Sequence, residues 1–453
     1  MPTSLLWLRR DLRLNDLPAL GAAHDAADGG RIVPVFVLDP VLLDQSAVRT
    51  HCVLTALASV QASYDGALVL RTGVPEEVIP ALVRECDATS VHITAESTPY
   101  GRRRDERVRD ALPDDVPLVA TGSAYAIGPG TIRNGSGDPY KVFTPFSKAW
   151  RDHGWHSPAQ VPANLRWHRQ VESENLPQRP GVEATLPEVS EEVALQRWND
   201  FASEAVGAYA EERDRPDHAG TSELSVHLKY GTIHPRTLLA DLAPRRSDGA
   251  YGFTTELAWR EFYADVLWHN PGSAWSDLKP QLGSMSYDDP YSDEDVAVSV
   301  QAWREGKTGY PFVDAGMRQL LAEGWMHNRV RMVTASFLCK HLHVWWPHGA
   351  RHFMQHLRDG DLASNNHGWQ WVAGTGTDAA PYFRIFNPTT QAQRFDPQGD
   401  YVRRYVPELR HIAGKAVHEP GKAEDGYAYG YPEPIVEHKT AREEALARYH
   451  QAR

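Results

Sequence analysis

The stretch Asp359-Gly-Asp-Leu-Ala-Ser-Asn-Asn-His-Gly-Trp-Gln-Trp371 brings two carboxylates, two adjacent amides and two indoles into thirteen positions. The helical sequence before it, residues 349–358, is expected to stop at Gly360, because glycine suits the left-handed residue after a helix end. Both aspartates and Asn365 are then expected in irregular backbone, where short polar side chains bond main-chain groups or reach a ligand. The stretch therefore predicts a buried polar site.

The two indoles of this stretch are expected to serve different neighbours. Trp369 and Trp371 flank one residue, so their side chains diverge in a strand and lie about 200° apart on a helix. Each indole N–H needs a partner when it is buried. A calcium loop is excluded, because its sixth position is Ser364 rather than glycine and its twelfth is Gln370 rather than glutamate.

The composition is that of a large globular protein rich in indoles. The chain has 453 residues, 42% of them apolar and 14 of them tryptophan, which allows two or three domains. Its cysteines, Cys52, Cys86 and Cys339, are far apart and indicate a reducing compartment. The apolar run at residues 5–8 is too short for a signal peptide or a membrane span, so we expect a cytoplasmic protein.

The charge distribution is uneven along the chain. A net charge of −12 argues against nucleic-acid binding, because phosphates attract cations. Between residues 304 and 358, however, eight basic residues meet three acidic ones, so a local basic patch stays open. His348, His352 and His356 share one helical face there. Without a glutamate in a zinc-type pattern, a solvated or DNA-facing stripe is favoured over a metal site.

The first part of the chain alternates strand and helix patterns. Strands are expected at residues 5–8, 32–38, 68–71 and 91–94, and helices at 48–64, 75–86 and 102–112. This alternation predicts a parallel sheet with helices on both faces. The charged run Arg9–Asp16 follows the first strand, where it either serves a ligand or forms a salt-bridged, solvated turn. No phosphate-binding glycine loop follows any of these strands.

The rest of the chain predicts a linker and a helical half. Residues 131–192 lose periodicity and are rich in proline, glycine and polar residues. A helix is expected from Pro311 to a stop at Gly324, and another over residues 325–344. The expected fold class is α/β plus all-α. A Rossmann-like parallel α/β domain covers residues 1–130, a linker 131–195 and a helical domain 196–453.

Four longer motifs are specific. They are Glu256-Leu-Ala-Trp-Arg-Glu-Phe262, Glu305-Gly-Lys-Thr-Gly-Tyr-Pro311, Trp325-Met-His-Asn-Arg-Val-Arg-Met332 and Thr375-Gly-Thr-Asp-Ala-Ala-Pro-Tyr-Phe-Arg-Ile-Phe-Asn-Pro388. With the opening stretch, they resemble the photolyase/cryptochrome family over essentially the whole chain, most closely its class I cyclobutane pyrimidine dimer photolyases. The resemblance implies an amino-terminal domain for an antenna chromophore and a helical domain for FAD.

The resemblance also implies residues for each part of the chemistry, in which reduced anionic FAD, excited by blue light, donates an electron to a flipped-out dimer in UV-damaged DNA. The implied FAD contacts are Tyr209, Thr221, Ser222, Glu223, Leu224, Ser225, Phe253, Arg260, Arg331, Asp359, Asp361 and Asn365. An ion pair is expected between Arg331 and Asp359. The implied lesion residues are Glu256, Trp259, Asn328, Met332 and Trp371, with Asn365 beside the flavin N5. The implied DNA contacts are Arg213, Glu256, Trp259, Arg260, Asn328, Arg329, Arg384 and Gln391.

Two departures from the family pattern leave alternatives open. Trp369 and Trp346 match the inner and middle members of a photoreduction relay, but the outer position falls near Asp293, so Tyr291, Trp303 or Trp345 completes the path or photoreduction is inefficient. The stretch Thr98-Pro-Tyr-Gly-Arg-Arg-Arg-Asp105 lacks the Asn-Glu pair of folate-binding members. It resembles the deazaflavin-binding members, with methenyltetrahydrofolate or no antenna as alternatives. The expected antenna contacts are Asp39, Arg49, Tyr100, Gly101 and Asp105.

A cryptochrome-type signalling photoreceptor is the chief functional alternative on the same scaffold. Asn365, rather than an acid or thiol beside N5, favours repair, as does the full set of Glu256, Trp259, Asn328 and Trp371. We expect a monomer that binds neither a metal nor a membrane.

Overall fold

The computed structural model describes residues 2–279, 282–378, 381 and 384–452. In this part of the chain, five parallel strands form one sheet in the order β3-β2-β1-β4-β5. The strands are β1 (Thr3–Leu8), β2 (Arg31–Leu38), β3 (Val69–Thr72), β4 (Ala88–Ala95) and β5 (Leu118–Ser123). The predicted parallel α/β fold is confirmed, and the four predicted strands match observed ones to within three residues.

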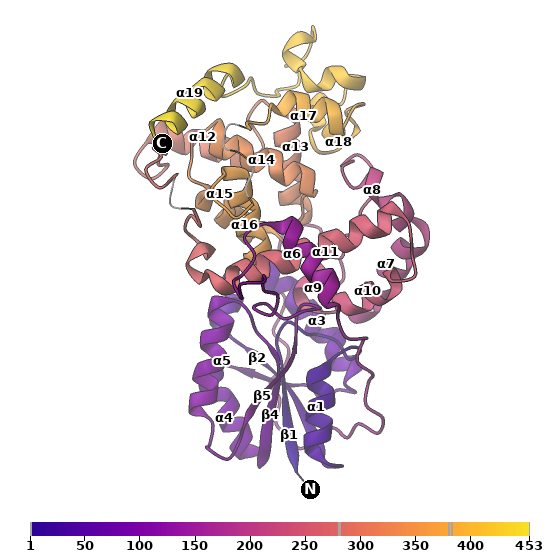
Figure 1. Ribbon diagram of the computed structural model, residues 1–453. Helices are drawn as coiled ribbons and strands as arrows, with labels where there is room; N and C mark the ends of the chain where they lie inside the picture. The colour runs from indigo at the N-terminus through magenta and orange to yellow at the C-terminus, as the bar shows by residue number, and fades with distance from the viewer. Residues whose placement is uncertain (1, 280–281, 379–380, 382–383, 453) are drawn as a thin grey trace. The chain divides into compact units, whose positions relative to one another are not determined.

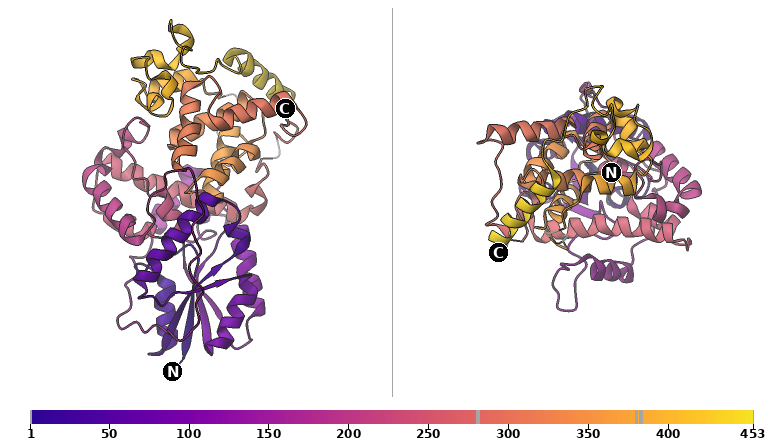
Figure 2. Two further views of the ribbon diagram at one scale, coloured as in Figure 1. Left: turned by 180° about the vertical axis from the view of Figure 1, so that it is seen from behind. Right: turned by 90° about the horizontal axis from the view of Figure 1, so that it is seen from above.

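Helices cover both faces of the sheet (Figure 1), and the view from behind shows the same two layers (Figure 2). They include α1 (Pro18–Ala27) and α3 (Ala47–Ser63) in one layer and α4 (Pro75–Glu85) and α5 (Pro99–Ala111) in the other. Side chains of a strand point alternately to its two faces, so Leu6 and Leu8 pack with α1 and α3, and Leu5 and Trp7 with α4 and α5. All of them are buried.

Two elements of the α/β fold, strand β5 and helix α1, carry no clear sequence signal. Strand β5 is half-exposed at the sheet edge, so it needs no continuous apolar run. Helix α1 faces the sheet mainly with alanines and Leu20, and no side chain caps its start. A strong hydrophobic pattern in the sequence arises where an element buries large apolar residues. Neither β5 nor α1 needs large apolar residues along its length.

The segment expected to be an irregular linker contains a helix. Helix α6 (Phe143–His153) buries Phe143, Phe146 and Trp150, which corrects the prediction of lost periodicity. Further along, Ile32 N donates to Arg166 O at 2.9 Å and His168 N donates to Ile32 O at 2.8 Å, so extended chain pairs with β2. The linker is therefore partly ordered by packing and backbone pairing.

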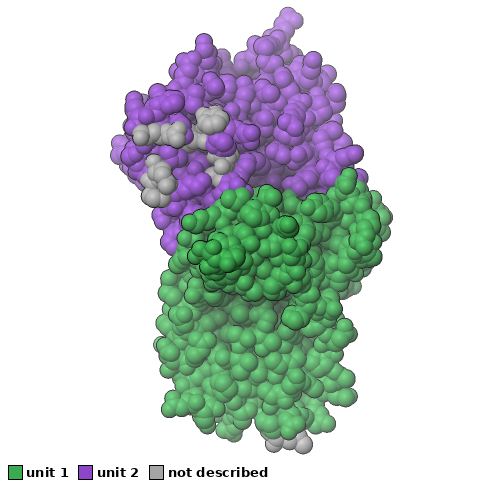
Figure 3. Space-filling view, viewed as in Figure 1, with its two compact units in different colours: residues 1–182, 186–207, 222–271 green, residues 183–185, 208–221, 272–453 purple. Residues whose placement is uncertain are grey.

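The chain divides into two compact units (Figure 3). Unit 1 comprises residues 1–182, 186–207 and 222–271, and unit 2 comprises 183–185, 208–221 and 272–453. Unit 1 adds α7 (Glu191–Glu204), α9 (Ser225–Tyr230), α10 (Pro235–Leu242) and α11 (Asp248–His269) to the sheet. Unit 2 includes α8 (Tyr209–Glu212), α12 (Glu294–Glu305), α13 (Pro311–Glu323), α14 (Asn328–Lys340), α15 (Trp346–His356), α16 (Leu362–Ala373), α17 (Pro388–Phe395), α18 (Asp400–Tyr405) and α19 (His438–Gln451). The predicted helical carboxy-terminal half is confirmed, whereas the division at residues 130 and 195 remains a prediction.

Some helix boundaries in unit 2 differ from expectation. Helix α13 runs as predicted from Pro311 to a left-handed Gly324. Helix α14 begins only at Asn328, because the side chain of His327 caps it by accepting from Arg329 N, and it ends at Lys340. Helix α15 ends at His356 with Leu357 extended, so the predicted stop at Gly360 is wrong. No helix of the described chain is long and apolar enough to cross a membrane.

Candidate functional site

Helix α16 carries most of the opening stretch. Its N-cap is Asp361, whose carboxylate accepts from Ser364 N at 3.0 Å. Asn365 therefore lies in regular helix rather than in the irregular backbone expected from the sequence. A carboxylate at this position also interacts favourably with the positive end of the helix dipole. Of the expected cofactor residues on this stretch, Asp359 precedes the helix, Asp361 caps it and Asn365 lies one turn inside.

The predicted ion pair between Arg331 and Asp359 is confirmed. Arg331 Nη2 donates to both oxygens of Asp359, at 2.9 and 3.2 Å, and Arg331 Nε donates to Met326 O at 2.7 Å. The Asp359 side chain is 4% exposed. A buried carboxylate needs a cation, so the pair fixes the start of the stretch against α14.

One face of α16 holds a chain segment through buried polar groups. Asn366 Nδ2 donates to Ala274 O, and Gln370 Nε2 donates to Ser273 O at 2.7 Å. Gln370 Oε1 in turn accepts from Leu278 N at 2.9 Å. We call Asn366, His367 and Gln370 the polar clamp, because all three side chains are buried and bind residues 273–278.

His367 completes the polar clamp as a neutral ring. Its Nδ1 lies 2.8 Å from Ala363 O, which only accepts, so Nδ1 carries the proton. Nε2 is then free to accept from the hydroxyl of Ser273 at 3.0 Å. Burial lowers the pKa of His367 to about 4, which agrees with this tautomer.

Asn365 presents an unused acceptor. Its Nδ2 donates to Ala350 O at 3.2 Å and to Asn366 Oδ1 at 2.8 Å. Among the residues that the structure describes, none donates to the amide oxygen of this half-buried residue. Together with the paired carboxylate of Asp359, it fits a planar cofactor that offers an N–H donor, as reduced flavin does at N5.

The two indoles of α16 diverge as predicted. Trp369 is 3% exposed and packs edge-on against Trp303 and Phe353, with ring centroids 6.1 and 5.0 Å away. Gly349 makes room for it, because a Cβ there would lie 2.2 Å from its ring. Trp371 is half-buried and borders the core of unit 2. One indole thus faces the aromatic interior, and the other keeps a solvent-accessible surface.

A second pair of indoles starts α15. Trp346 is fully buried and its Nε1 donates to Asp277 Oδ1 at 2.7 Å. The half-buried Trp345 points its Nε1 at the same oxygen at 3.4 Å, and the two ring centroids are 6.3 Å apart. Among the expected outer relay residues, Trp303 is fully buried and cannot reach solvent. Tyr291 is 81% exposed, and its ring lies 5.3 Å from that of His348.

Some of the expected lesion and DNA residues of unit 2 lie in the first turns of α14, whereas Arg384 lies near its end, where its carbonyl accepts from Lys340. Asn328 is exposed, and Met332 lies one turn further on the same face. Arg329 pairs with Asp214 at 2.7 Å and lies over Phe395 at 4.4 Å. The remaining members are Arg213 over Tyr209, exposed Arg384 and half-buried Gln391. The neighbours Ala379, Ala380, Tyr382 and Phe383 of the fourth motif lie outside the described residues.

The expected site residues of unit 1 lie mainly on α11. Phe253 is buried, Glu256 is half-buried, and Trp259 stacks on Phe143 with ring centroids 3.6 Å apart. One face of the Trp259 indole is therefore covered by α6. Arg260 donates to Ala124 O at 3.0 Å and to Leu228 O at 3.1 Å, so its guanidinium already holds two backbone carbonyls.

The expected phosphate-binding run precedes α9, as the sequence suggests. Ser222 Oγ accepts from Leu224 N at 3.4 Å, Glu223 adopts a positive φ of 50°, and α9 begins at Ser225. Thr221 belongs to unit 2, as does Tyr209, which is 8% exposed at the start of α8.

The expected antenna residues divide into two groups in unit 1. Tyr100 donates its hydroxyl hydrogen to Asp39, and Thr98 caps α5 next to it by accepting from Gly101 N at 3.1 Å. Asp105 instead pairs with Arg104 at 2.8 Å and with Arg9 at 3.5 Å. Arg49 has Gln45 as a side-chain partner. Tyr100 thus contacts Asp39 directly and is linked to Asp105 through Arg104, whose guanidinium lies 5.9 Å from the Tyr100 ring centroid.

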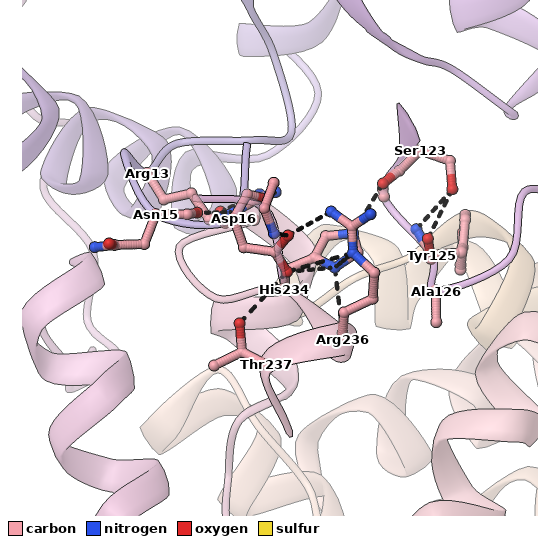
Figure 4. Close-up of polar contacts among 12 residues, drawn as sticks. Arg13, Asn15, Asp16, Ser123, Tyr125, Ala126, His234, Arg236 and Thr237 are labelled. Carbon is pink, nitrogen blue, oxygen red and sulfur yellow. Dashed lines mark hydrogen bonds and ion pairs between the residues drawn. The ribbon is translucent and has the colours of Figure 1, made fainter. Parts of the chain in front are cut away.

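The charged run after β1 is an internal network around Asp16 (Figure 4). Arg236 donates to the Asp16 carboxylate, and Arg13 donates to Asp16 O at 2.6 Å and Gly231 O at 2.9 Å. His234 Nε2 donates to Ser123 O at 2.9 Å. Its Nδ1 then accepts from Arg236 Nε at 3.2 Å, which makes the ring neutral. Arg13 and Asp16 are each 3% exposed, so this end of the run is a buried, salt-bridged turn, whereas Arg9 and Arg10 at its start line a small pocket.

The basic stretch and the histidine row are partly buried. Lys340 is 1% exposed and donates to Arg384 O at 3.0 Å, and burial lowers its pKa to about 8. Arg318 pairs with Glu408 at 2.7 Å. Burial lowers the pKa of His352 to about 3, so the expected solvated, charged stripe is wrong. No group of metal-ligating side chains occurs in the residues that the structure describes.

Two residues with a place in the site escaped the sequence interpretation. Asn366 differs from its neighbour Asn365 only by being buried, which a single sequence does not show. Asp277 lies 69 positions from the indole that it binds. Their signal exists only in the fold, because it consists of contacts between distant segments.

Comparison with known proteins identifies the family. Residues 4–163 match the family described as DNA photolyase, and residues 253–451 match the FAD binding domain of DNA photolyase. The deoxyribodipyrimidine photo-lyase of Escherichia coli is 40% identical, over 100% of this chain and 99% of that protein. The chain therefore belongs to the photolyase/cryptochrome family and contains its FAD-binding domain.

Solved structures agree with this assignment. A bacterial class III photolyase from Agrobacterium tumefaciens is similar with a TM-score of 0.91 and 35% identity, covering 100% of this chain and 98% of that one. A cryptochrome from Synechocystis is similar with a TM-score of 0.88 and 27% identity, covering 99% of both chains. The fold is thus shared with a protein named a photolyase and with one named a cryptochrome.

Proposed function

We propose that the protein is a blue-light-driven DNA repair enzyme that splits cyclobutane pyrimidine dimers, and that it belongs to class I. The end-to-end similarity, at 40% identity, to a deoxyribodipyrimidine photo-lyase carries the repair function. The class I assignment rests on the sequence motifs, because a class III member has the same fold. UV-damaged DNA is the macromolecular partner, and the enzyme acts as a monomer in the cytoplasm.

Within this proposal, bound reduced FAD would supply one electron to the dimer under light, and the electron would return after the ring opens. Asp359 and Arg331 would hold the cofactor as a paired charge, and the Asn365 oxygen would accept a hydrogen bond from its N5 side. Trp371 offers the dimer a stacking surface, and Asn328 and Glu256 bond its carbonyl groups and stabilise charge as it develops. Arg329, Arg213 and Arg384 bind flanking phosphates.

The domain roles follow the sequence-based division. Residues 1–130 hold an antenna chromophore and residues 196–453 hold FAD and the lesion, joined by 131–195. A deazaflavin is the favoured antenna, with methenyltetrahydrofolate or none as alternatives. The contact between Tyr100 and Asp39 supports a polar antenna site near the end of β2. The absorption spectrum of the purified protein distinguishes these choices, since the two chromophores absorb at different wavelengths.

We assign the outer position of the electron relay to Trp345. Trp369 and Trp346 form the inner and middle members, and Trp345 is in ring contact with Trp346 and half-buried. Trp303 lacks an exposed edge, and Tyr291 lies against His348. Trp345→Phe should slow light-driven flavin reduction severalfold, and Trp303→Phe should leave that rate nearer the wild-type value. The reverse order would remove Trp345 from the path.

The decisive assay compares light with darkness. The reduced, FAD-loaded protein is incubated with an oligonucleotide containing one thymine dimer, and restored thymines are counted by chromatography. Repair in blue light alone is expected. A cryptochrome-type photoreceptor, suggested by the similarity to the Synechocystis protein, would bind FAD but restore no thymines. A protein without bound flavin would contradict both functions.

A further inference from the structure

The side chain of Asn366 has no assigned role, yet it lies between the protein core and Asn365. It is fully buried, and its two polar atoms bind different partners. Nδ2 donates to Ala274 O, and Oδ1 accepts from Asn365 Nδ2 at 2.8 Å. Two adjacent amides therefore form a chain of hydrogen bonds from a backbone carbonyl to the outward-facing oxygen of Asn365.

The donor and acceptor roles in this series of hydrogen bonds are fixed by the backbone carbonyl at its inner end. A backbone carbonyl only accepts, so the atom of Asn366 that faces Ala274 must be the NH₂ group. Its other atom, Oδ1, must then accept, and Asn365 must turn its own NH₂ group toward it. The Asn365 oxygen is left pointing away from the core. Flipping Asn366 would set two acceptors against each other in a buried place, which costs the desolvation of an unpaired polar group.

A second contact supports the same orientation. Asn365 Nδ2 also donates to Ala350 O, at the longer distance of 3.2 Å. Ala350 lies on α15 and Ala274 lies in the segment held by the polar clamp, so contacts from two parts of unit 2 favour the same amide orientation. All four residues belong to the same compact unit.

We propose that Asn366 is a positioning residue that locks the Asn365 amide with its oxygen toward the flavin and thereby favours the reduced cofactor. Reduced flavin carries an N–H at N5, whereas oxidised flavin has a lone pair there. A fixed acceptor bonds the first and opposes the second. The inference rests on the proposed function, in which Asn365 lies beside N5, and it assigns the preference for the reduced form to a residue that does not touch the cofactor.

The test is a double-mutant cycle on the reduction potential of bound FAD. The potential is measured in the wild type, Asn365→Leu, Asn366→Leu and the double variant. Removing one neutral hydrogen bond changes an equilibrium by about fivefold, so Asn366→Leu should lower the ratio of affinities for reduced and oxidised FAD by about that factor. Asn365→Leu should lower it at least as much. The double variant should match Asn365→Leu, because Asn366 acts only through Asn365.

Asn366→Asp gives a variant that retains the native geometry in one protonation state. As a neutral acid, its hydroxyl donates to Ala274 O and its carbonyl accepts from Asn365, as in the wild type. As a carboxylate, it cannot donate to Ala274. At low pH, where the acid is neutral, the potential of this variant should be near the wild-type value measured at the same pH, whereas that of Asn366→Leu should stay shifted. A merely structural role of Asn366 would give no such rescue.

The outcomes separate the two proposals. Additive shifts in the double variant, or an unchanged potential in Asn366→Leu, overturn the role of Asn366 and leave the repair function intact. Absence of FAD from the wild-type protein overturns the proposed function itself. Thermal unfolding of each variant accompanies the potentials, and Asn366→Asp carries the test if Asn366→Leu does not fold.

Discussion

The networks around Asp16 in unit 1 and around the polar clamp in unit 2 are both buried, and both tie a helix to a distant segment. Around Asp16, the polar groups bind one another: Arg236 binds the carboxylate, Arg13 binds backbone carbonyls, and His234 is neutral between Arg236 and Ser123. Around α16, the hydrogen bonds end on the oxygen of Asn365. The first network is closed, and the second is open at one atom.

This difference indicates which of the two networks binds a ligand. Buried polar groups are almost always paired, so a network whose groups all pair with one another needs no ligand and is part of the fold. An open network is completed only by something outside it. Disturbing the closed network should change stability alone, whereas disturbing the open one should change the cofactor as well. The following predictions test that contrast from the largest effect on stability to the smallest.

Arg236→Met should produce the largest loss of stability. It leaves the Asp16 carboxylate, whose side chain is 2% exposed, without its cation, and such a change costs about 3–5 kcal/mol. Urea unfolding measures the loss. The matched control is Arg246→Met on the surface, which should stay within about 0.5 kcal/mol of the wild type. An unchanged unfolding free energy in Arg236→Met would show that the Asp16 carboxylate does not need Arg236 as its cation.

A second closed network predicts a pH effect. Glu261 accepts from Trp150 Nε1 at 2.6 Å, Ala126 N at 2.6 Å and Ile127 N at 3.1 Å. Burial nevertheless raises its pKa to about 7 from 4.5. A raised pKa in the folded state means that its stabilising contribution is present below pH 4.5 and is lost as pH rises through about 7.

Glu261→Gln cannot titrate, so it isolates this contribution. Between pH 4.5 and 8, the wild type should lose roughly 3 kcal/mol relative to the variant, beyond any constant difference between them. Unfolding free energies at several pH values provide the measurement. Parallel pH profiles would mean that the three donors keep the carboxylate ionised throughout.

Asp361→Asn should have the smallest effect on stability and a clear effect on the ligand. Asparagine caps a helix about as well as aspartate, so the unfolding free energy should change by less than about 0.5 kcal/mol. FAD affinity should fall about tenfold, since the proposed site loses a charge-assisted hydrogen bond. Fluorescence titration of the apoprotein with FAD measures it. Equal affinity in both proteins would limit Asp361 to its capping role.

The sequence predicted the parts of this molecule in which local pattern and structure agree. Short apolar runs between helical segments located four strands, and proline and glycine marked the two ends of α13. The Arg331–Asp359 pair was expected because family motifs bring the two residues together, and the structure contains it. These features depend on neighbours in the chain or on a shared ancestral pattern.

The remaining features depend on which side of an element is buried. The histidine spacing placed His352 and its neighbours on one face of α15, but only the fold shows that this face is not a charged, solvated stripe. Asn365 and Asn366 are identical residues in adjacent positions, and one is half-buried while the other has no exposed surface. The Asp277 contact to two indoles joins segments far apart in the sequence. Tertiary packing decides each of these.

The central claim is that the single helix α16 serves cofactor, electron path and lesion through different faces. One paired measurement tests it: light-driven flavin reduction and affinity for a dimer-containing oligonucleotide, both determined in Trp369→Phe and Trp371→Ala. Trp369→Phe should slow photoreduction and bind the lesion normally, because its indole lies in the aromatic interior. Trp371→Ala should weaken lesion binding and keep photoreduction. Equal losses of both properties in both variants would contradict the division.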